Sequence, residues 1–234
     1  MVASRLCHKV ALRKQLSRIS KIKSLFSDYD LRYLVFERFS FYYGKIFTTA
    51  DKLLYNGRLR IESPFRVWGR IRFLIHGSGS ISIGKDFHAV STRRRSFITL
   101  FSPCHLTVVG TAEIVLGDHV GLNGTTFVAR KKIIVGDNTM IGPNTIIVDH
   151  DAHAAWPPSE RWIRKGSSAE IIIEPDVWIG MNCIILKGVR IGIGSIIAAG
   201  SVVIEDVDPH SLYAGNPAKK VKEFADKSTR ELTQ

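Results

Sequence analysis

A six-residue period governs residues 171–207 of this chain. An aliphatic side chain recurs at every sixth position from Ile173 to Val203, six times in succession. An amphipathic α-helix repeats its apolar residues every 3.6 positions and a half-buried strand every second position, so neither requires this period. A period of six instead predicts short strands joined by bends, with three strands completing one triangular coil. Because one coil cannot bury its own aliphatic side chains, coils must stack, and the sequence predicts a solenoid.

The same pattern extends upstream with changes of phase. A second inward position falls at the fifth residue of each hexad, which is small or β-branched from Val177 to Val207. The solenoid is therefore expected over 71–208, with parallel pairing between successive coils. Upstream inward positions six residues apart are Leu116, Leu122 and Val128, then Val135, Ile141 and Ile147.

One segment interrupts the repeat. The step from Ile147 to Ile173 is 26 residues, which is not a multiple of six. The intervening segment 149–170 contains two prolines, two tryptophans and many polar residues, and it has no hexad register. We expect a loop that protrudes from one corner of a coil. Long loops inside a tight repeat are usually functional, so this loop is a candidate site.

Positive charge is concentrated in the N-terminal part of the chain. The net charge is +12; residues 1–72 hold 16 Lys/Arg against 5 Asp/Glu, and residues 73–234 hold 17 against 16. Apolar residues near helical spacing, with seven basic residues and no acid, predict a basic amphipathic helix over 1–25. This helix either contacts an anionic membrane, or it caps the solenoid or packs in an oligomer. No nucleic-acid-binding module accompanies the charge, so no nucleic-acid partner is expected.

The two ends of the chain differ from the solenoid. Residues 1–70 are expected to form a basic, partly helical segment, and residues 209–234 a turn and a short helix that begins at Pro217. No run of 18 apolar residues and no secretory signal occurs in the sequence, and the three cysteines are widely spaced. We therefore expect a cytoplasmic protein, peripheral at the inner face of the membrane if the basic helix binds lipid.

Three further motifs point to a family. They are "VWIG" at 177–180, "AAGSVV" at 198–203 and "AGNPAKKVK" at 214–222. Together with the hexads, they resemble the hexapeptide-repeat acyltransferases, in particular the maltose, galactoside and polysaccharide O-acetyltransferase branch, over about 71–222. The resemblance implies a left-handed parallel β-helix assembled as a homotrimer. The whole chain is then expected to be mainly β, with an N-terminal helical segment and a short C-terminal helix.

The resemblance also implies an activity and its residues. The enzyme would transfer an acetyl group from acetyl-CoA, its co-substrate, to a hydroxyl of a sugar or polysaccharide acceptor. Such a transfer needs a base, and histidine has a pKa near neutrality. The family's catalytic histidine precedes the long loop and corresponds to His150, whose ring Asp149 or Asp151 would orient. The acetyl-CoA site corresponds to Trp178, Gly180, Ala199, Gly200, Lys219 and Lys222. The family presents an asparagine to the acceptor near Asn123. The loop residues His153 and Trp162 are further candidates for acceptor contacts, and His153 is also the second candidate for the base.

Structural interpretations compete with these assignments. The Trp178 indole would serve trimer packing equally well, and Lys219 and Lys222 would lie on a solvated helix face. The aromatic loop would pack on a neighbouring subunit as readily as on a sugar. The sequence also departs from the family at Ile204 and Glu205, where many members have threonine and lysine; this departure bears on the contact near the CoA adenine.

Two other functions remain open at this stage. A degenerate acyltransferase fold would be a non-catalytic trimeric scaffold, which the unmatched N-terminal third of the chain favours. A zinc enzyme similar to the β-helical carbonic anhydrases would need three histidines shared across an interface. His150 and His153 are only three residues apart, and His119 is a poor third ligand, so no metal is expected.

Overall fold

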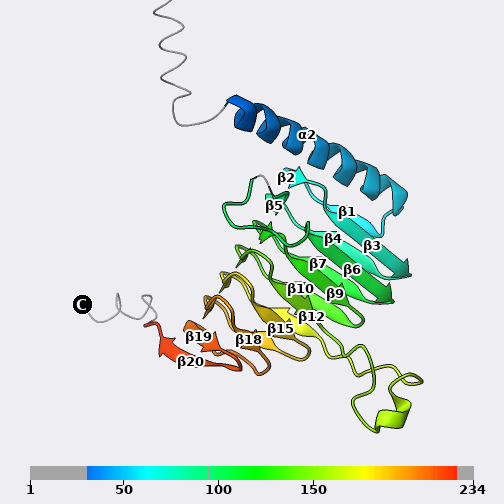
Figure 1. Cartoon of the computed structure of the whole chain (residues 1–234), viewed down its shortest axis with the longest axis vertical. Helices are drawn as coiled ribbons and strands as arrows, with labels where there is room; N and C mark the ends of the chain where they lie inside the picture. Colours follow the sequence, from blue (N-terminus) through cyan, green and yellow to red (C-terminus); the bar gives the residue numbers. More distant parts are fainter. Residues whose placement is uncertain (1–30, 94, 226–234) are drawn as a thin grey trace, which may run out of the picture. The chain divides into compact units, whose positions relative to one another are not determined.

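The computed structural model describes residues 31–93 and 95–225 (Figure 1). The chain divides into two units between residues 39 and 40, within the helix α2, Leu31–Leu54. The amphipathic helix predicted over 1–25 lies outside the described residues. Short parallel strands follow α2, so the predicted left-handed parallel β-helix with a helical N-terminal segment is confirmed. None of the described helices is long and apolar enough to cross a membrane.

Three sheets of mainly parallel strands form the three faces of the solenoid, which we name A, B and C. Face A contains β1 (Leu59–Ile61), β4 (Ser80–Ile83), β7 (Glu113–Leu116), β10 (Lys132–Val135), β13 (Ile171–Ile173) and β16 (Arg190–Ile191). Face B contains β2 (Phe65–Gly69), β5 (Phe87–Ser91), β8 (Gly121–Asn123), β11 (Met140–Ile141), β14 (Trp178–Ile179), β17 (Ile196–Ile197), β19 (Ser211–Gly215) and β20 (Ala218–Glu223). Face C contains β3 (Arg72–Gly77), β6 (His105–Gly110), β9 (Thr126–Ala129), β12 (Ile146–Val148), β15 (Ile184–Leu186) and β18 (Val202–Val203).

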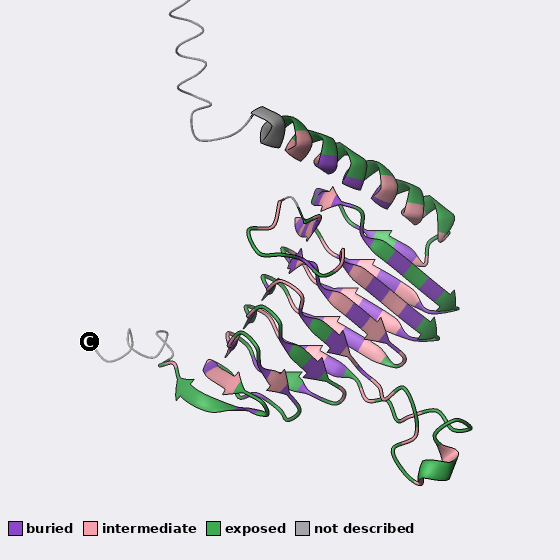
Figure 2. Cartoon of the chain, viewed as in Figure 1, coloured by how far each residue is buried: buried purple, intermediate pink, exposed green. Residues whose placement is uncertain are grey.

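The aliphatic ladder predicted from the hexads fills the interior. Ile173, Ile179 and Ile185 are fully buried and stack in register on the equivalent residues of the preceding coil. The fifth-position residues from Val177 to Val207 are buried as well. Figure 2 shows how buried and outward residues alternate along the strands. Because each buried aliphatic side chain contributes about 1.5–3 kcal/mol, the stacked ladder is the main source of stability.

The earlier coils differ from the prediction in two respects. The sequence pattern places Val128 inside, but the structure buries Phe127 and stacks it on Ile147. Side chains alternate along a strand, so this slip of one residue turns Val128 outward. The solenoid also begins before residue 71, since β1 already pairs in parallel with β4.

The inner side of α2 covers the first coil. The ring of Phe41 packs on Trp68, with centroids 5.7 Å apart. Gly44 lies against backbone carbonyl groups of β2, where a Cβ atom would collide. The Lys52 ammonium donates a hydrogen bond to the Ile61 carbonyl at 2.7 Å. The C-terminal part of α2 therefore closes this end of the solenoid, as a terminal cap must.

A second insertion, residues 92–104, connects β5 of face B with β6 of face C. The sequence prediction does not include it. Leu100 is fully buried and packs at the corner formed by Gly124. The Asn144 side chain bonds to two backbone groups of the insertion, at 2.9 and 3.0 Å. These contacts fix the insertion on the neighbouring coils.

The C-terminal helix predicted from Pro217 is wrong for the described residues. β19 and β20 instead form an antiparallel hairpin on face B, with Gly215 paired to Ala218 at its turn. Pro217 lies in this turn, and proline is common in turns as well as at helix starts. Residues 226–234 lie outside the described part of the chain.

Candidate active site

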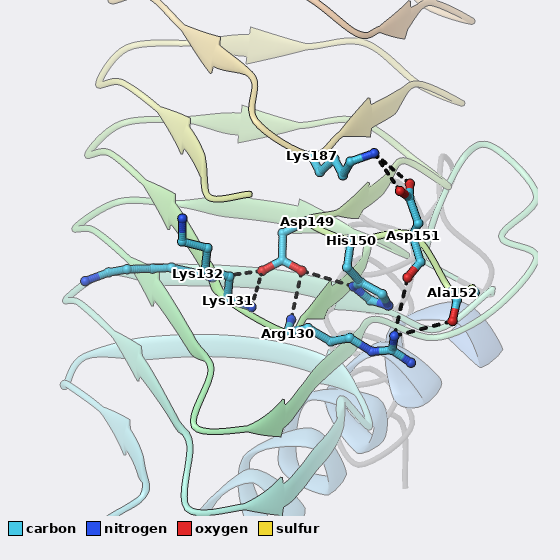
Figure 3. A network of polar contacts seen from close by, with 8 residues as sticks. All are labelled: Arg130, Lys131, Lys132, Asp149, His150, Asp151, Ala152 and Lys187. Atoms are coloured by element: carbon cyan, nitrogen blue, oxygen red, sulfur yellow. Dashed lines mark hydrogen bonds and ion pairs between the residues drawn. The ribbon is translucent and has the colours of Figure 1, made fainter. Parts of the chain in front are cut away.

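His150 opens the long loop at the corner where face C passes to face A. It follows β12, and its side chain is only 8% exposed. Its Nδ1 lies 3.0 Å from Oδ1 of Asp149, whose carboxylate is completely buried. Asp151, the other predicted partner, turns instead to Lys187 (Figure 3). The structure thus places His150 and Asp149 in direct contact.

The corner beneath this pair is wider than its equivalent in the regular coils. The chain takes eight residues from Phe127 to Val135, whereas the equivalent step from Ile185 to Ile191 takes six. The added length falls at residues 130–132, where β9 has ended and β10 begins. Their backbone N–H groups consequently turn toward the interior, where the Asp149 carboxylate lies.

Asp149 accepts four hydrogen bonds at this corner. Its Oδ1 accepts from the Arg130 N–H at 2.8 Å and faces the His150 ring. Its Oδ2 accepts from the N–H groups of Lys131 and Lys132 at 2.7 and 2.8 Å. These bonds compensate for removing a carboxylate from water. An acceptor surrounded by donors requires His150 to donate from Nδ1, which leaves the Nε2 lone pair available as a base.

A second polar group holds the base of the loop. The Arg130 guanidinium donates to the carbonyl of Asp151 at 3.3 Å, and the Asp151 carboxylate accepts from Lys187 at 2.8 Å and from Ser167 at 2.9 Å. The hydrogen bond from Lys187 is the main cause that lowers the pKa of Asp151 below its ordinary value. The backbone of His150 also forms an antiparallel bridge with Ser168. The two ends of the loop are therefore closed on each other beside the His150 ring.

The outer part of the loop carries the other predicted acceptor residues. His153 donates a hydrogen bond from Nδ1 to the Arg161 carbonyl at 2.9 Å. Its ring meets the edge of Trp162, with centroids 5.4 Å apart. Trp162 is 90% exposed. In the sequence, the short 3₁₀ helix η1 (Pro158–Glu160) lies between His153 and Trp162. His153 and Trp162 thus contact each other and not the Asp149 carboxylate.

The residues predicted for acetyl-CoA gather on a different edge, where face B passes to face C. Gly180 stands directly on the next coil, where an added Cβ would lie 2.6 Å from the Ala199 nitrogen. Ala199 and Gly200 are exposed, and Gly200 has a positive φ of 75° with open space around it. Trp178 is half exposed on β14, two residues before Gly180. The structure therefore brings these four residues together on adjacent coils.

The two predicted phosphate-binding lysines lie on β20, which continues face B beyond that edge. Both are exposed, on a strand and not on the predicted helix. The Lys219 ammonium pairs with Glu205 at 2.8 Å, and the Lys222 ammonium lies 5.4 Å from the Phe224 ring centroid. Glu205 is one of the two departures from the family pattern, and the other, Ile204, is exposed. Lys219 therefore has a carboxylate partner within the chain.

One chain does not bring all the predicted site residues together. His150 lies at the edge between faces C and A, and Trp178 lies on face B. Asn123 ends β8 on face B, and its Oδ1 is buried without a hydrogen-bond partner among the described residues. Sequence reasoning missed Arg130 and Lys187, which hold the loop base. The sequence does not distinguish these two residues from other basic residues that are exposed to solvent at a coil corner.

Neither described cysteine is placed to act as a nucleophile. Cys104 and Cys183 are fully buried, and burial raises the pKa of both thiols, that of Cys104 to about 11. Within residues 31–93 and 95–225, no group of three or more potential ligands could hold a metal ion. His119 pairs with Asp86 at 3.4 Å, at a corner between faces A and B, away from His150.

Comparison with known proteins identifies the repeat. Residues 170–205 match the family model described as "Bacterial transferase hexapeptide (six repeats)". A hexapeptide-repeat containing acetyltransferase of Vibrio cholerae, solved with acetyl coenzyme A, is 30% identical over 66% of this chain and 72% of that chain, with a TM-score of 0.46. The chain belongs to the hexapeptide-repeat transferase family.

Other members of the family extend the comparison. A 2,3,4,5-tetrahydropyridine-2,6-dicarboxylate N-acetyltransferase of Enterococcus faecalis is 48% identical over 66 residues, which is 28% of this chain and 28% of that protein. This chain matches less than half the length of the curated relatives. AntD, an N-acyltransferase from Bacillus cereus solved with dTDP and 3-hydroxybutyryl-CoA, has a TM-score of 0.53 at 22% identity, over 82% of this chain and 94% of that chain. This likeness supports the fold.

Proposed function

We propose that this hexapeptide-repeat protein is an acetyl-CoA-dependent O-acetyltransferase that acts on a hydroxyl of a sugar, with His150 as its general base. One observation carries the proposal. The buried Asp149 carboxylate holds the Nδ1–H of His150 at a loop-bearing corner, which leaves Nε2 as the proton acceptor. The acceptor would be a polysaccharide, an oligosaccharide or a precursor of one.

The proposed reaction is direct transfer. His150 Nε2 takes the proton of the acceptor hydroxyl as its oxygen attacks the thioester carbonyl of acetyl-CoA. The tetrahedral intermediate then expels the CoA thiolate, which takes the proton back from the imidazolium. Asp149 stabilises the imidazolium between these steps, because its carboxylate lies 3.0 Å from Nδ1. No covalent acyl-enzyme is needed, in keeping with the burial of Cys104 and Cys183.

The edge between faces B and C suits a long, thin co-substrate. Ala199 and Gly200 expose backbone and small side chains there, the half-exposed Trp178 indole offers a flat apolar surface, and Lys219 lies beyond them for a phosphate. Acetyl-CoA would bind along this edge. Its thioester must then reach a His150 that lies at another edge of the prism, so the site requires a second copy of the chain.

Face C provides a surface for that second copy. Its outward residues on β12, β15 and β18 are all aliphatic, and Ile146, Ile184 and Leu186 are exposed in the single chain. Face A, in contrast, carries outward charges such as Lys132 and Arg190. An uncharged aliphatic face of this kind is typical of a stable interface. We place the contacts of the homotrimer on face C, between the edge of His150 and the acetyl-CoA edge.

Transfer to an amine is the second candidate function. The Enterococcus faecalis relative is an N-acetyltransferase, and it is more similar in sequence, over a shorter span, than the Vibrio cholerae protein. A base at His150 would serve an amine acceptor by removing the proton that the attacking nitrogen carries. The two candidates differ only in the acceptor, so amino sugars belong in the same assay as neutral sugars.

The deciding experiment is a His150→Ala substitution in the full chain. Release of CoA thiol is followed with neutral sugars and amino sugars as acceptors, and acetyl-CoA binding is measured by calorimetry. We expect kcat to fall by about 10²–10⁴-fold, with acetyl-CoA binding unchanged. His119→Ala, an exposed histidine at the corner between faces A and B and away from face C, is the matched control and should keep full activity.

Two results would count against the proposal. Near-normal turnover by His150→Ala would remove the general base from the mechanism. Absence of acetyl-CoA binding by the parent protein at about 1 mM, the upper end of ordinary KM values, would favour the non-catalytic scaffold.

A further inference from the structure

Within residues 40–54, the helix α2 exposes large apolar residues on the side away from the solenoid. The side that faces the solenoid is mixed: Phe41 packs on Trp68, but Asp51 pairs with Arg70 at 4.0 Å, and Lys52 donates to a backbone carbonyl of β1. The opposite side carries large apolar residues. Surface helices of globular proteins normally turn charged and polar residues outward. The outward side of α2 therefore needs a partner other than the solenoid.

We define the outward surface of α2 as the eight exposed residues of this stretch. They are Tyr42, Tyr43, Lys45, Ile46, Thr49, Ala50, Leu53 and Leu54. Ile46 is 65% exposed and Leu53 79%, and Lys45 is the single charge in the set. Figure 2 shows this side of the helix in green. An exposed apolar strip of this length marks an interaction surface.

The insertion 92–104 presents a second apolar projection. Phe97 is fully exposed and Phe101 is 72% exposed, although Leu100 between them is buried in the corner of the next coil. The insertion lies at the same end of the solenoid as α2, because the guanidinium of Arg95 stacks 3.9 Å from the ring centroid of Trp68, which also packs on Phe41 of α2.

The charge around both projections is strongly positive. Residues 40–104 contain eleven Lys/Arg and three Asp/Glu. One of the three acids, Asp51, is paired with Arg70, and another, Asp86, faces His119. Apolar and aromatic side chains within a field of cations match an anionic bilayer surface, in which acyl chains lie beneath acidic headgroups.

We infer that the outward surface of α2, together with Phe97 and Phe101 of the insertion, docks on an anionic lipid bilayer. The helix lies on the surface and does not span it, since it is too polar to cross. A second copy of the chain fits less well. Two such surfaces would bring Lys45 and the surrounding cations together, with no acidic residue on either surface to pair with them. This inference is independent of the proposed catalytic activity.

The test is co-sedimentation of the full chain with lipid vesicles. One set contains equal parts of phosphatidylcholine and phosphatidylglycerol, and the other contains phosphatidylcholine alone. The variant carries Ile46→Ser and Leu53→Ser, two exposed positions whose replacement leaves the core intact. Ile163→Ser, in the long loop, is the matched control because Ile163 is 82% exposed but far along the solenoid from α2.

We expect the parent and the control to bind the anionic vesicles, and added salt to weaken the binding. Each α2 substitution should lower the partition coefficient by roughly tenfold, about a hundredfold together. Unchanged binding by the double variant would overturn the inference, because residues 1–30 alone would then account for adhesion. Absence of vesicle binding, with an oligomer that dissociates in the double variant on light scattering, would overturn it in favour of a contact between copies.

Discussion

Replacing Asp149 by asparagine tests whether the buried carboxylate sets the state of His150. An amide nitrogen at the Oδ2 position would leave two backbone N–H groups, those of Lys131 and Lys132, without an acceptor. An amide nitrogen at the Oδ1 position would leave only the Arg130 N–H without an acceptor, because the His150 ring can itself accept a hydrogen bond at Nδ1. The second orientation is therefore favoured, and it moves the ring proton to Nε2.

A ring protonated at Nε2 cannot take a proton from the acceptor. Loss of a positioned general base costs about 10²–10⁴-fold, and the equivalent asparagine substitution in a serine-protease triad lies at the upper end. We expect kcat to fall by about 10³–10⁴-fold in Asp149→Asn, with acetyl-CoA binding unchanged. One buried N–H loses its acceptor, so the free energy of unfolding should decrease by about 1–3 kcal/mol.

Thiol release measures the turnover of this variant, and urea denaturation followed by circular dichroism measures its stability. The control is Asp206→Asn, because Asp206 also accepts a backbone N–H at a corner, that of Arg190 at 2.7 Å, without a histidine beside it. The control should keep its turnover. Parent-like turnover in Asp149→Asn, or an equal loss in the control, would refute the argument that the carboxylate acts through the tautomer of His150.

Three further predictions concern the acetyl-CoA edge and the loop. Glu205→Gln should release Lys219 for phosphate and strengthen acetyl-CoA binding severalfold by calorimetry; unchanged binding, also with dephospho-CoA, would exclude Lys219 from the site. Lys187→Met should cost about 0.5 kcal/mol in urea denaturation at neutral pH. Because Lys187 lowers the pKa of Asp151, the pair stabilises the fold above the ordinary carboxyl pKa of about 4, and this stabilisation is lost as the pH falls through the lower pKa of Asp151 in the folded protein. A stability difference between parent and variant that persists in acid would contradict this. Gly180→Ala should lower the melting temperature, with a loss of about 1–3 kcal/mol, since its Cβ would lie 2.6 Å from a backbone nitrogen of the next coil; an unchanged melting temperature would show that the coils can separate there.

The regular part of the fold could be predicted because its signal repeats. From Ile173 to Val203 the first position of every hexad is aliphatic, and one error would have stood out against five agreements. Phe127 was missed because the step from Leu122 is five residues, and Val128 next to it satisfied the expected six. The hairpin of β19 and β20 was missed because "AKKVKE" has no alternation that separates an edge strand from a helix.

The site could be predicted only in part, for a related reason. A histidine before a loop marks His150, and Asp149 beside it is visible in the sequence. The three N–H groups that hold Asp149 belong to residues 130–132, whose identities play no part in the contact. The insertion 92–104 left a trace, since the step from Ala89 to Leu106 is not a multiple of six, but its position over the Asn144 coil depends on tertiary contacts.

The two ends of face B have a consequence for how copies of this chain can associate. A stack of parallel strands has no intrinsic length, and an open edge would accept the edge of another molecule and grow into a fibre. Gly44 of α2 lies against the carbonyl groups at one end, and the antiparallel strand β20 ends the other with Lys219, Lys220 and Lys222. Edge lysines and covering helices are means by which natural sheets prevent such growth. Face B is thus blocked at both ends, and copies are directed to meet side by side.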